Sequence, residues 1–188
     1  MAKPLPVSLF TFFLSAALLL DGCCANNVCN CDDANADAVT LRFFTGGPGG
    51  RPFAATDLDT VVLLRSPLPY NASTKPETVR LFRGPAQAND DVVLNNNTPF
   101  GQVSNTKLSH YRYEVQYLAH PTNQGTPTTV LVIDSVKLKG SLAADGCCAC
   151  YTNTGKTVYA KINRKSGSVP DSAVVVDLKS KPYIVLTK

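Results

Sequence analysis

The stretch His110-Tyr-Arg-Tyr-Glu-Val-Gln-Tyr117 decides the expected fold. Its two sets of alternate positions differ in character. One set holds Tyr111, Tyr113, Val115 and Tyr117, whereas the other holds His, Arg, Glu and Gln. This period of two is typical of a β-strand with one buried face and one solvated face. The stretch therefore predicts a strand within a sheet that packs against a second layer.

The tyrosines of this strand have two interpretations. In the first, Tyr111, Tyr113 and Tyr117 form an exposed binding face for a sugar or a peptide, because tyrosine rings bury area and their hydroxyl groups make hydrogen bonds. In the second, the same rings pack in the core of a protein that contains no tryptophan. The sequence favours the core and leaves the binding face open.

Short strand-like segments continue along the rest of the chain. Turn-forming Gly, Pro, Asn or Asp residues bound each of them, and no long helical period is present. The predicted strands cover residues 38–45, 60–65, 78–83, 111–118, 128–139, 156–163, 173–178 and 183–187. The pattern predicts an all-β fold: an antiparallel β-sandwich of about eight strands, immunoglobulin-like or transthyretin-like, with a barrel as the alternative.

The polar segment 87–107 is the longest stretch without a clear period. It contains Asn95-Asn-Asn-Thr-Pro99, a run of residues that favour turns. We expect an exposed loop in this segment that crosses from one sheet to the other.

The N-terminus carries an export pattern. Lys3 precedes an apolar run that ends at Leu20, and this run is short for a bilayer core of about 30 Å. The next residues, Leu20-Asp-Gly-Cys23, resemble the lipobox of bacterial lipoproteins, in which the cysteine is acylated and becomes the first residue of the mature chain. Asp21 departs from that pattern, because a small or uncharged residue is usual there. The resemblance implies lipidation at Cys23.

Ordinary cleavage after Ala25 is the alternative, and it predicts a soluble secreted or periplasmic protein. Parity favours the lipoprotein, because lipid on Cys23 leaves six of the seven cysteines, whereas cleavage after Ala25 leaves five and hence an unpaired thiol. We therefore expect a signal peptide over residues 1–22, a cysteine-rich tether over residues 23–37 and a single β-sandwich domain over residues 38–188.

The lipoprotein resemblance also implies a destination. Cys24, rather than an aspartate, follows Cys23, and the sorting logic of Gram-negative lipoproteins then implies the outer membrane of the cell envelope. The expected partners are the membrane, through the lipid anchor, and an envelope protein or a glycan. Because the net charge of +4 is spread over strand-like segments, we expect no nucleic acid as a partner.

The cysteines other than Cys23 fall into two groups near the ends of the mature chain. The candidates for disulfide bonds are Cys24, Cys29, Cys31, Cys147, Cys148 and Cys150. Because export favours oxidation, we expect bridges from the N-terminal group to a loop that follows the strand ending near residue 139. The spacing of the cysteines does not fix which of them pair.

Metal binding or thiol redox chemistry is the alternative role of these cysteines. Four thiolates, from Cys29, Cys31, Cys148 and Cys150, would hold Zn²⁺, and fewer would hold Cu⁺. Each pair has a single residue between its members, a spacing shorter than that of common zinc knuckles. The sequence therefore favours disulfides, and we expect no cofactor.

Catalytic motifs are absent from the sequence. The two histidines, His110 and His120, lie at opposite ends of the strand 111–118, about 33 Å apart if that strand is straight. We expect a binding or structural role and no enzymatic activity. A hydrolase built around one of these histidines is the remaining alternative.

Overall fold

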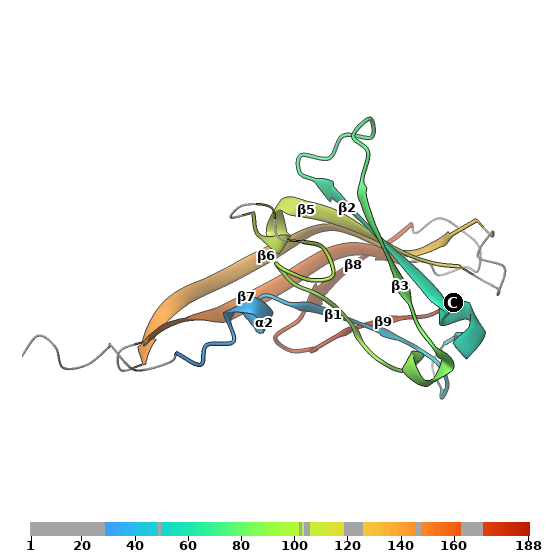
Figure 1. Cartoon of the computed structure of the whole chain (residues 1–188), viewed down its shortest axis with the longest axis horizontal. Coiled ribbons are helices and arrows are strands. Elements are labelled where there is room, and N and C mark those ends of the chain that lie inside the picture. Colours follow the sequence, from blue (N-terminus) through green and yellow to red (C-terminus); the bar gives the residue numbers. More distant parts are fainter. Residues whose placement is uncertain are drawn as a thin grey trace, which may run out of the picture.

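The computed structural model describes residues 29–48, 50–101, 103, 106–118, 126–145, 148–162 and 171–188. Together these residues form nine strands and a few short helical turns (Figure 1). Several predictions fall outside the described residues: the signal peptide, Cys23, Cys24, His120 and Cys147.

Six of the strands form one antiparallel sheet in the order β3-β2-β5-β6-β7-β8. Their bounds are β2 (Thr60–Pro67), β3 (Glu77–Phe82), β5 (Tyr111–Tyr117), β6 (Thr128–Asp145), β7 (Cys148–Ile162) and β8 (Ser172–Asp177). The sheet curls into a half-barrel. β6 and β7 form a long hairpin whose far end extends beyond the other strands (Figure 1).

The other three strands form a small sheet in the order β4-β1-β9. Their bounds are β1 (Val39–Phe43), β4 (Val92–Leu94) and β9 (Ile184–Leu186). β1 runs antiparallel to β4 and parallel to β9, with Leu41 opposite Ile184. The predicted all-β, sandwich-like fold is confirmed, although this one strand pair is parallel.

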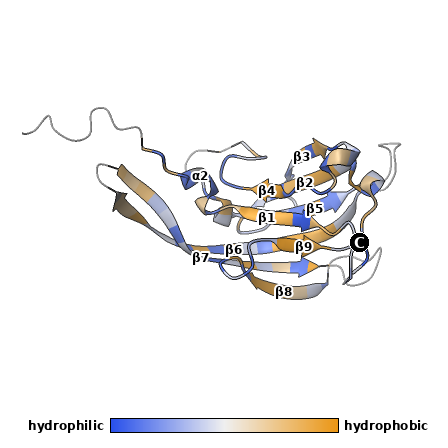
Figure 2. Cartoon of the chain, turned by 90° about the horizontal axis from the view of Figure 1, so that it is seen from below, coloured by the Kyte–Doolittle hydropathy of each residue, from blue (hydrophilic) through white to orange (hydrophobic). Residues whose placement is uncertain are grey.

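The core lies between the two sheets. Along β1 the side chains of Val39, Leu41 and Phe43 are buried while their neighbours are partly exposed, as the period of two requires. Phe53 joins the layers, because the centre of its ring lies 5.3 Å from that of Phe43 and 5.2 Å from that of Tyr117, in edge-on contacts. Figure 2 shows the apolar residues concentrated in the strands of both layers. Burial of this apolar surface is the main force that holds the two sheets together.

Helical structure in the described residues is confined to single turns. These are α2 (Asp33–Ala36), η1 (Ala55–Leu58), η2 (Pro85–Gln87) and η3 (Leu108–His110). None of the helices in the described ranges has the length and apolar character needed to cross a membrane.

All eight predicted strands are present. Of two expectations about the segments between them, the first is incomplete and the second is wrong. The predicted loop 87–107 contains a ninth strand, β4, which is too short to show a period. The predicted loop after residue 139 is also strand, because β6 continues to residue 145 and β7 begins at residue 148. The two strands stay paired past a register shift at Lys139/Gly140.

Candidate functional site

Two disulfide bonds join the N-terminal segment to the far end of the β6–β7 hairpin. Cys29 bonds to Cys148 and Cys31 to Cys150, with Cα atoms 5.5 Å and 5.3 Å apart. The predicted pairing between the two cysteine groups is confirmed for these four residues, although Cys148 and Cys150 lie in a strand and not in a loop. The bonds indicate an oxidising compartment, as expected of an exported protein.

The metal alternative for Cys29, Cys31, Cys148 and Cys150 does not fit this structure. Their sulfurs are bonded to one another, so none is available as a thiolate ligand. In the described part of the chain, no three His, Cys, Asp or Glu side chains gather closely enough to hold a metal ion.

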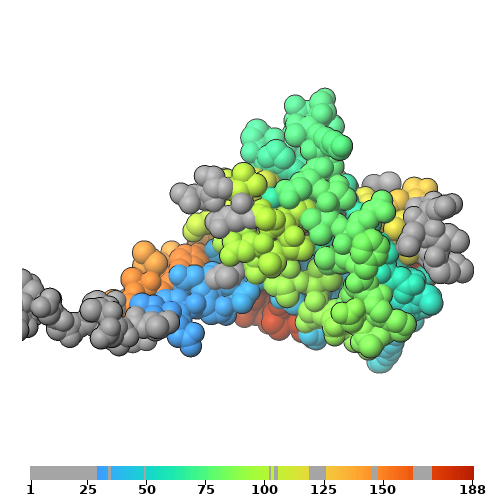
Figure 3. Space-filling view, in the orientation of Figure 1, coloured from blue at the N-terminus to red at the C-terminus, as the bar shows by residue number. Residues whose placement is uncertain are grey.

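Polar contacts reinforce the disulfides at the same place. Asp33 Oδ1 accepts a hydrogen bond from the backbone N–H of Tyr151 at 2.8 Å. The carboxylate of Asp37, which is only 1% exposed, accepts from the Tyr151 hydroxyl at 3.1 Å and from Asn153 Nδ2 at 2.7 Å. Figure 3 shows the N-terminal segment lying against the protruding hairpin. The described part of the predicted tether, residues 29–37, is therefore bonded to the hairpin.

The proposed binding face of Tyr111, Tyr113 and Tyr117 is wrong, because all three side chains lie in the core and are at most 9% exposed. The Tyr113 hydroxyl donates to the carbonyl of Leu108 at 3.2 Å. Burial raises the pKa of Tyr113 well above its ordinary value, so its phenol stays neutral. The alternative interpretation, that the rings pack in the core, is the correct one.

A buried arginine lies beside these rings. Arg65 is 4% exposed, and its guanidinium lies 4.7 Å from the ring centre of Phe100 and 4.4 Å from that of Tyr111. It also forms an ion pair with Glu77 and donates to the carbonyl of Gly101 at 3.0 Å. These contacts satisfy the buried charge and explain Arg65 as part of the core.

Of the two histidines in the hydrolase alternative, the structure describes His110. It is exposed on η3 and does not line either of the two cavities discussed below. No catalytic partner for it is apparent among the described residues that line those cavities.

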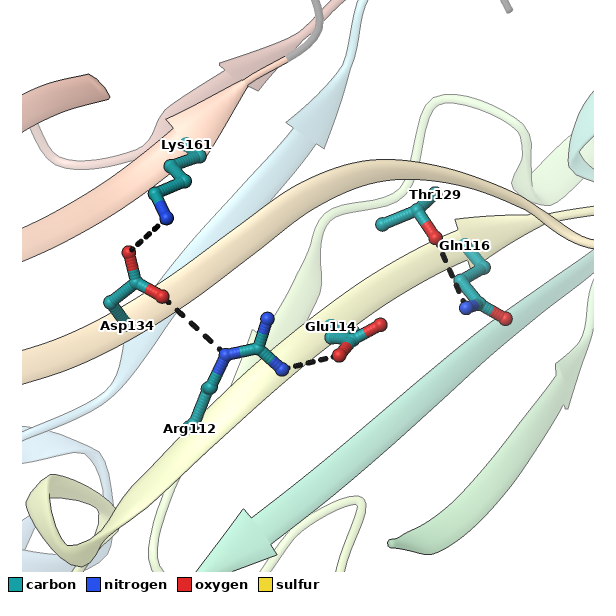
Figure 4. A network of polar contacts seen from close by, with 6 residues as sticks. All are labelled: Arg112, Glu114, Gln116, Thr129, Asp134 and Lys161. Carbon is teal, nitrogen blue, oxygen red and sulfur yellow. Dashed lines mark hydrogen bonds and ion pairs between the residues drawn. The ribbon is translucent and has the colours of Figure 1, made fainter. Parts of the chain in front are cut away.

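The outer face of the six-stranded sheet, turned away from the core, carries two groups of charged residues. The first lies on β5, β6 and β7 and is drawn in Figure 4. Arg112 forms ion pairs with Glu114 and, at 3.4 Å, with Asp134, whose second oxygen lies 3.6 Å from Lys161 Nζ. Each cation of this network has a carboxylate partner, so the network is a structural feature of the sheet surface.

The second group lines a cavity of about 520 Å³ further along the same face. We call it the lysine cavity. Its lining residues are Lys137, Lys139, Thr154, Gly155, Lys156, Thr157, Tyr159, Asp177 and Lys179. The strand register brings them together, because Lys137 lies opposite Thr157 on β7, and Thr157 lies opposite Asp177 on β8. Paired residues in adjacent strands share a face.

The positive charge of three of the four lysines in this cavity is not balanced by any carboxylate partner that the structure describes. Among the described residues, no carboxylate forms an ion pair with Lys137, Lys139 or Lys179. The one acid in the lining, Asp177, accepts a hydrogen bond from the backbone N–H of Lys179 at 2.9 Å. The lysine cavity is therefore a site of attraction for anions.

The ammonium groups are held at separate places around the cavity. Lys179 Nζ donates to the carbonyl of Asn153 at 3.0 Å, and Lys137 Nζ lies 4.9 Å from the centre of the Tyr159 ring. The fourth lysine, Lys156, donates instead to the carbonyl of Ala38, where the small sheet begins. Burial lowers the pKa of Lys156; the nearby charge of Asp37 opposes this shift and that of Lys179 adds to it.

The sequence interpretation missed this site, since it used the spread of positive charge along the chain only to exclude nucleic acid. The alternation of Lys137 and Lys139 on a strand is the one signal that sequence offers. Lys179 is distant in the chain, and only the register of β7 and β8 places it beside them.

Comparison of the chain with models of known protein families, with curated proteins and with solved structures found no match. The arguments for function therefore rest on the residues of the site itself.

Proposed function

We propose that this protein is a binding protein of the cell envelope, held at the membrane by lipid on Cys23. The observation that carries the binding role is the lysine cavity, where three lysines lack carboxylate partners among the described residues. A concave, positively charged surface fits an anionic partner. Among the envelope partners expected from sequence, a glycan or a protein, the cavity favours one that carries negative charge.

The disulfides determine which part of the domain a lipid on Cys23 would hold near the membrane. Cys29 follows Cys23 by six residues (29 minus 23) and is bonded to Cys148 at the end of the hairpin. Six residues of fully extended chain span at most about 20 Å. A lipid on Cys23 would therefore keep the hairpin end of the domain close to the membrane surface, with the lysine cavity further along the same hairpin.

The alternative proposal is a soluble protein cleaved after Ala25, and the mass of the mature protein separates the two. We would measure the intact mass of protein purified from the membranes of a bacterial host, before and after reduction and alkylation. The expected mass begins at Cys23 with acyl chains attached. Cys29, Cys31, Cys148 and Cys150 should react with the alkylating reagent only after reduction.

Matched variants make this experiment decisive. Cys23→Ser should abolish acylation and membrane retention, whereas Cys24→Ser should leave both intact, because only the first cysteine matches the acylated position. A mature chain that begins at Asn26, or a Cys23→Ser variant that still carries lipid, would contradict the anchor.

A further inference from the structure

The uncharged residues that line the lysine cavity indicate more about its ligand than the lysines alone do. Beside the lysines it offers the hydroxyl groups of Thr154 and Thr157 and the ring of Tyr159, which lies on the cavity side of β7. Hydroxyl groups and a tyrosine ring bind the hydroxyls and the carbon faces of sugars, because a tyrosine combines an apolar surface with a hydrogen-bonding group. A site that recognised only negative charge would not need these hydroxyl groups or an aromatic ring.

The arrangement of the cations favours an extended ligand. Lys137 and Lys139 are two residues apart on β6, so their Cα atoms are separated by about 6.7 Å. Lys179 is held on the other side of the cavity by the Asn153 carbonyl. A small anion such as phosphate is best bound by donors that converge on one point. These ammonium groups instead fit several negative charges spaced along a chain.

A second cavity continues the surface. It has a volume of about 350 Å³ and lies beside the Cys31–Cys150 bond. Its lining residues are Asn30, Cys31, Asp32, Ala36, Cys150, Tyr151, Thr152, Asn153 and Lys179. Lys179 lines both cavities, so the two are neighbours on the molecule. The second cavity therefore adjoins the lysine cavity at Lys179, on the side of the Cys31–Cys150 bond.

We infer that the lysine cavity binds an acidic polysaccharide, a chain of sugars that carry carboxylate or sulfate groups. The lysines contact the acidic groups, Tyr159 packs against a sugar ring, and the threonines bond to sugar hydroxyls. This inference rests on the binding role proposed above and names its ligand class. The network of Arg112, Glu114, Asp134 and Lys161 on the same face does not take part, because its two cations are balanced by two carboxylates.

Titration calorimetry tests the inference on protein purified from membranes in a neutral detergent. The probes are oligogalacturonate for carboxylates, dextran sulfate for sulfates, and neutral dextran as the uncharged reference. At least one acidic chain should bind, its affinity should fall as salt is added, and neutral dextran should not bind. The acidic chain that binds more tightly identifies the charged group.

Two variants locate the site. Lys137→Gln with Lys139→Gln should weaken binding of the acidic chain about tenfold, because two exposed charge pairs with the ligand are lost. Tyr159→Leu keeps apolar volume but removes the ring and its hydroxyl, and should weaken binding about fivefold. The matched control is Lys75→Gln with Lys181→Gln, which removes the same charge outside the cavity and should leave affinity unchanged.

Several outcomes would overturn the inference. They are no binding of either acidic chain, an equal loss of affinity in the control variant, and equal binding of neutral dextran. Displacement of the sugar chain by micelles containing phosphatidylglycerol, or tighter binding of double-stranded DNA, would assign the cavity to a different partner. The mass measurement decides the anchor without any ligand, so an anchored protein that ignores both acidic chains overturns this inference alone.

Discussion

The two halves of the β6–β7 hairpin are held by different forces. In the half nearer the core, Leu131 and Ile133 of β6 are fully buried between the sheets. In the far half, Leu142 of the same strand is 69% exposed, and β7 is fixed there by disulfides to Cys29 and Cys31. One ribbon is thus stabilised by burial at one end and by covalent bonds at the other. A β-hairpin can extend beyond its core when another segment cross-links it.

The largest loss of stability should come from removing the disulfides in the far half of the hairpin. Each bridge spans 119 residues, but once one has formed, the other closes only a short ring. Replacing one pair by alanines should therefore cost about 2 kcal/mol, because the long loop stays closed. Replacing all four cysteines should cost about 7 kcal/mol, since closing the long loop is worth about 5 kcal/mol. Urea unfolding of the three variants measures these free energies.

The two single-bridge costs should not add up to the cost of the fourfold variant. If the cost of the fourfold variant equals the sum of the two single-bridge costs, the bridges do not share one long loop in the unfolded chain. The comparison between the two halves of the hairpin would then need another explanation.

At the buried end, Ile133→Ala should lower the free energy of unfolding by about 2 to 5 kcal/mol, because it leaves a cavity between the sheets. Leu142→Ala is the matched control on the same strand, and its cost should stay within about 0.5 kcal/mol. Thermal and urea unfolding measure both. Similar costs for the two variants would show that exposure does not separate the halves of the hairpin in solution.

The polar contacts of the far half should have a smaller effect. Asp37→Ala removes the buried acceptor of Tyr151 and Asn153 and should cost about 1 to 3 kcal/mol. Asp33→Ala removes one exposed bond to the Tyr151 backbone and should cost less. Amide exchange should also accelerate in the far half of β7 in the Asp37 variant. Unchanged exchange there would mean that the disulfides alone hold the hairpin.

The smallest effect is a dependence on pH at the buried end. Tyr113 has a raised pKa in the folded protein, whereas the unfolded chain ionises near pH 10.0. Its contribution to stability is therefore fully present below that pH and is lost as the pH rises from there toward the folded pKa. Tyr113→Phe should flatten this alkaline fall in the free energy of unfolding. Identical pH profiles for the variant and the parent would rule out Tyr113 as its source.

Sequence predicted the parts of the fold that burial creates. Strands such as β1 and β5 alternate apolar and polar residues because one face meets the core, and this period is visible without a structure. The far half of the hairpin was missed, because Gly140, Ser141 and Ala143 show no such period. Pairing with β7 and cross-linking make these residues a strand, and neither leaves a local pattern.

The site was harder to predict for the same reason. The two groups of cysteines and the export pattern indicated bridges between them, but the partners of Cys29 and Cys31 required coordinates. The lysine cavity depends on the register of three strands, which places Lys179 beside residues of β6. The register between strands that are distant in sequence is a property of the whole fold, so local sequence patterns do not predict it.

The parallel pairing of β1 with β9 has a consequence for the order of folding. Leu41 meets Ile184, so the small sheet gains its third strand only after residues 184–186 have been synthesised. Contacts this distant in sequence slow folding, because a long loop closes before they form. We expect the nascent chain to stay incompletely folded until residues 184–186 have been synthesised. That delay suits a protein that crosses a membrane as an extended chain and folds on the far side.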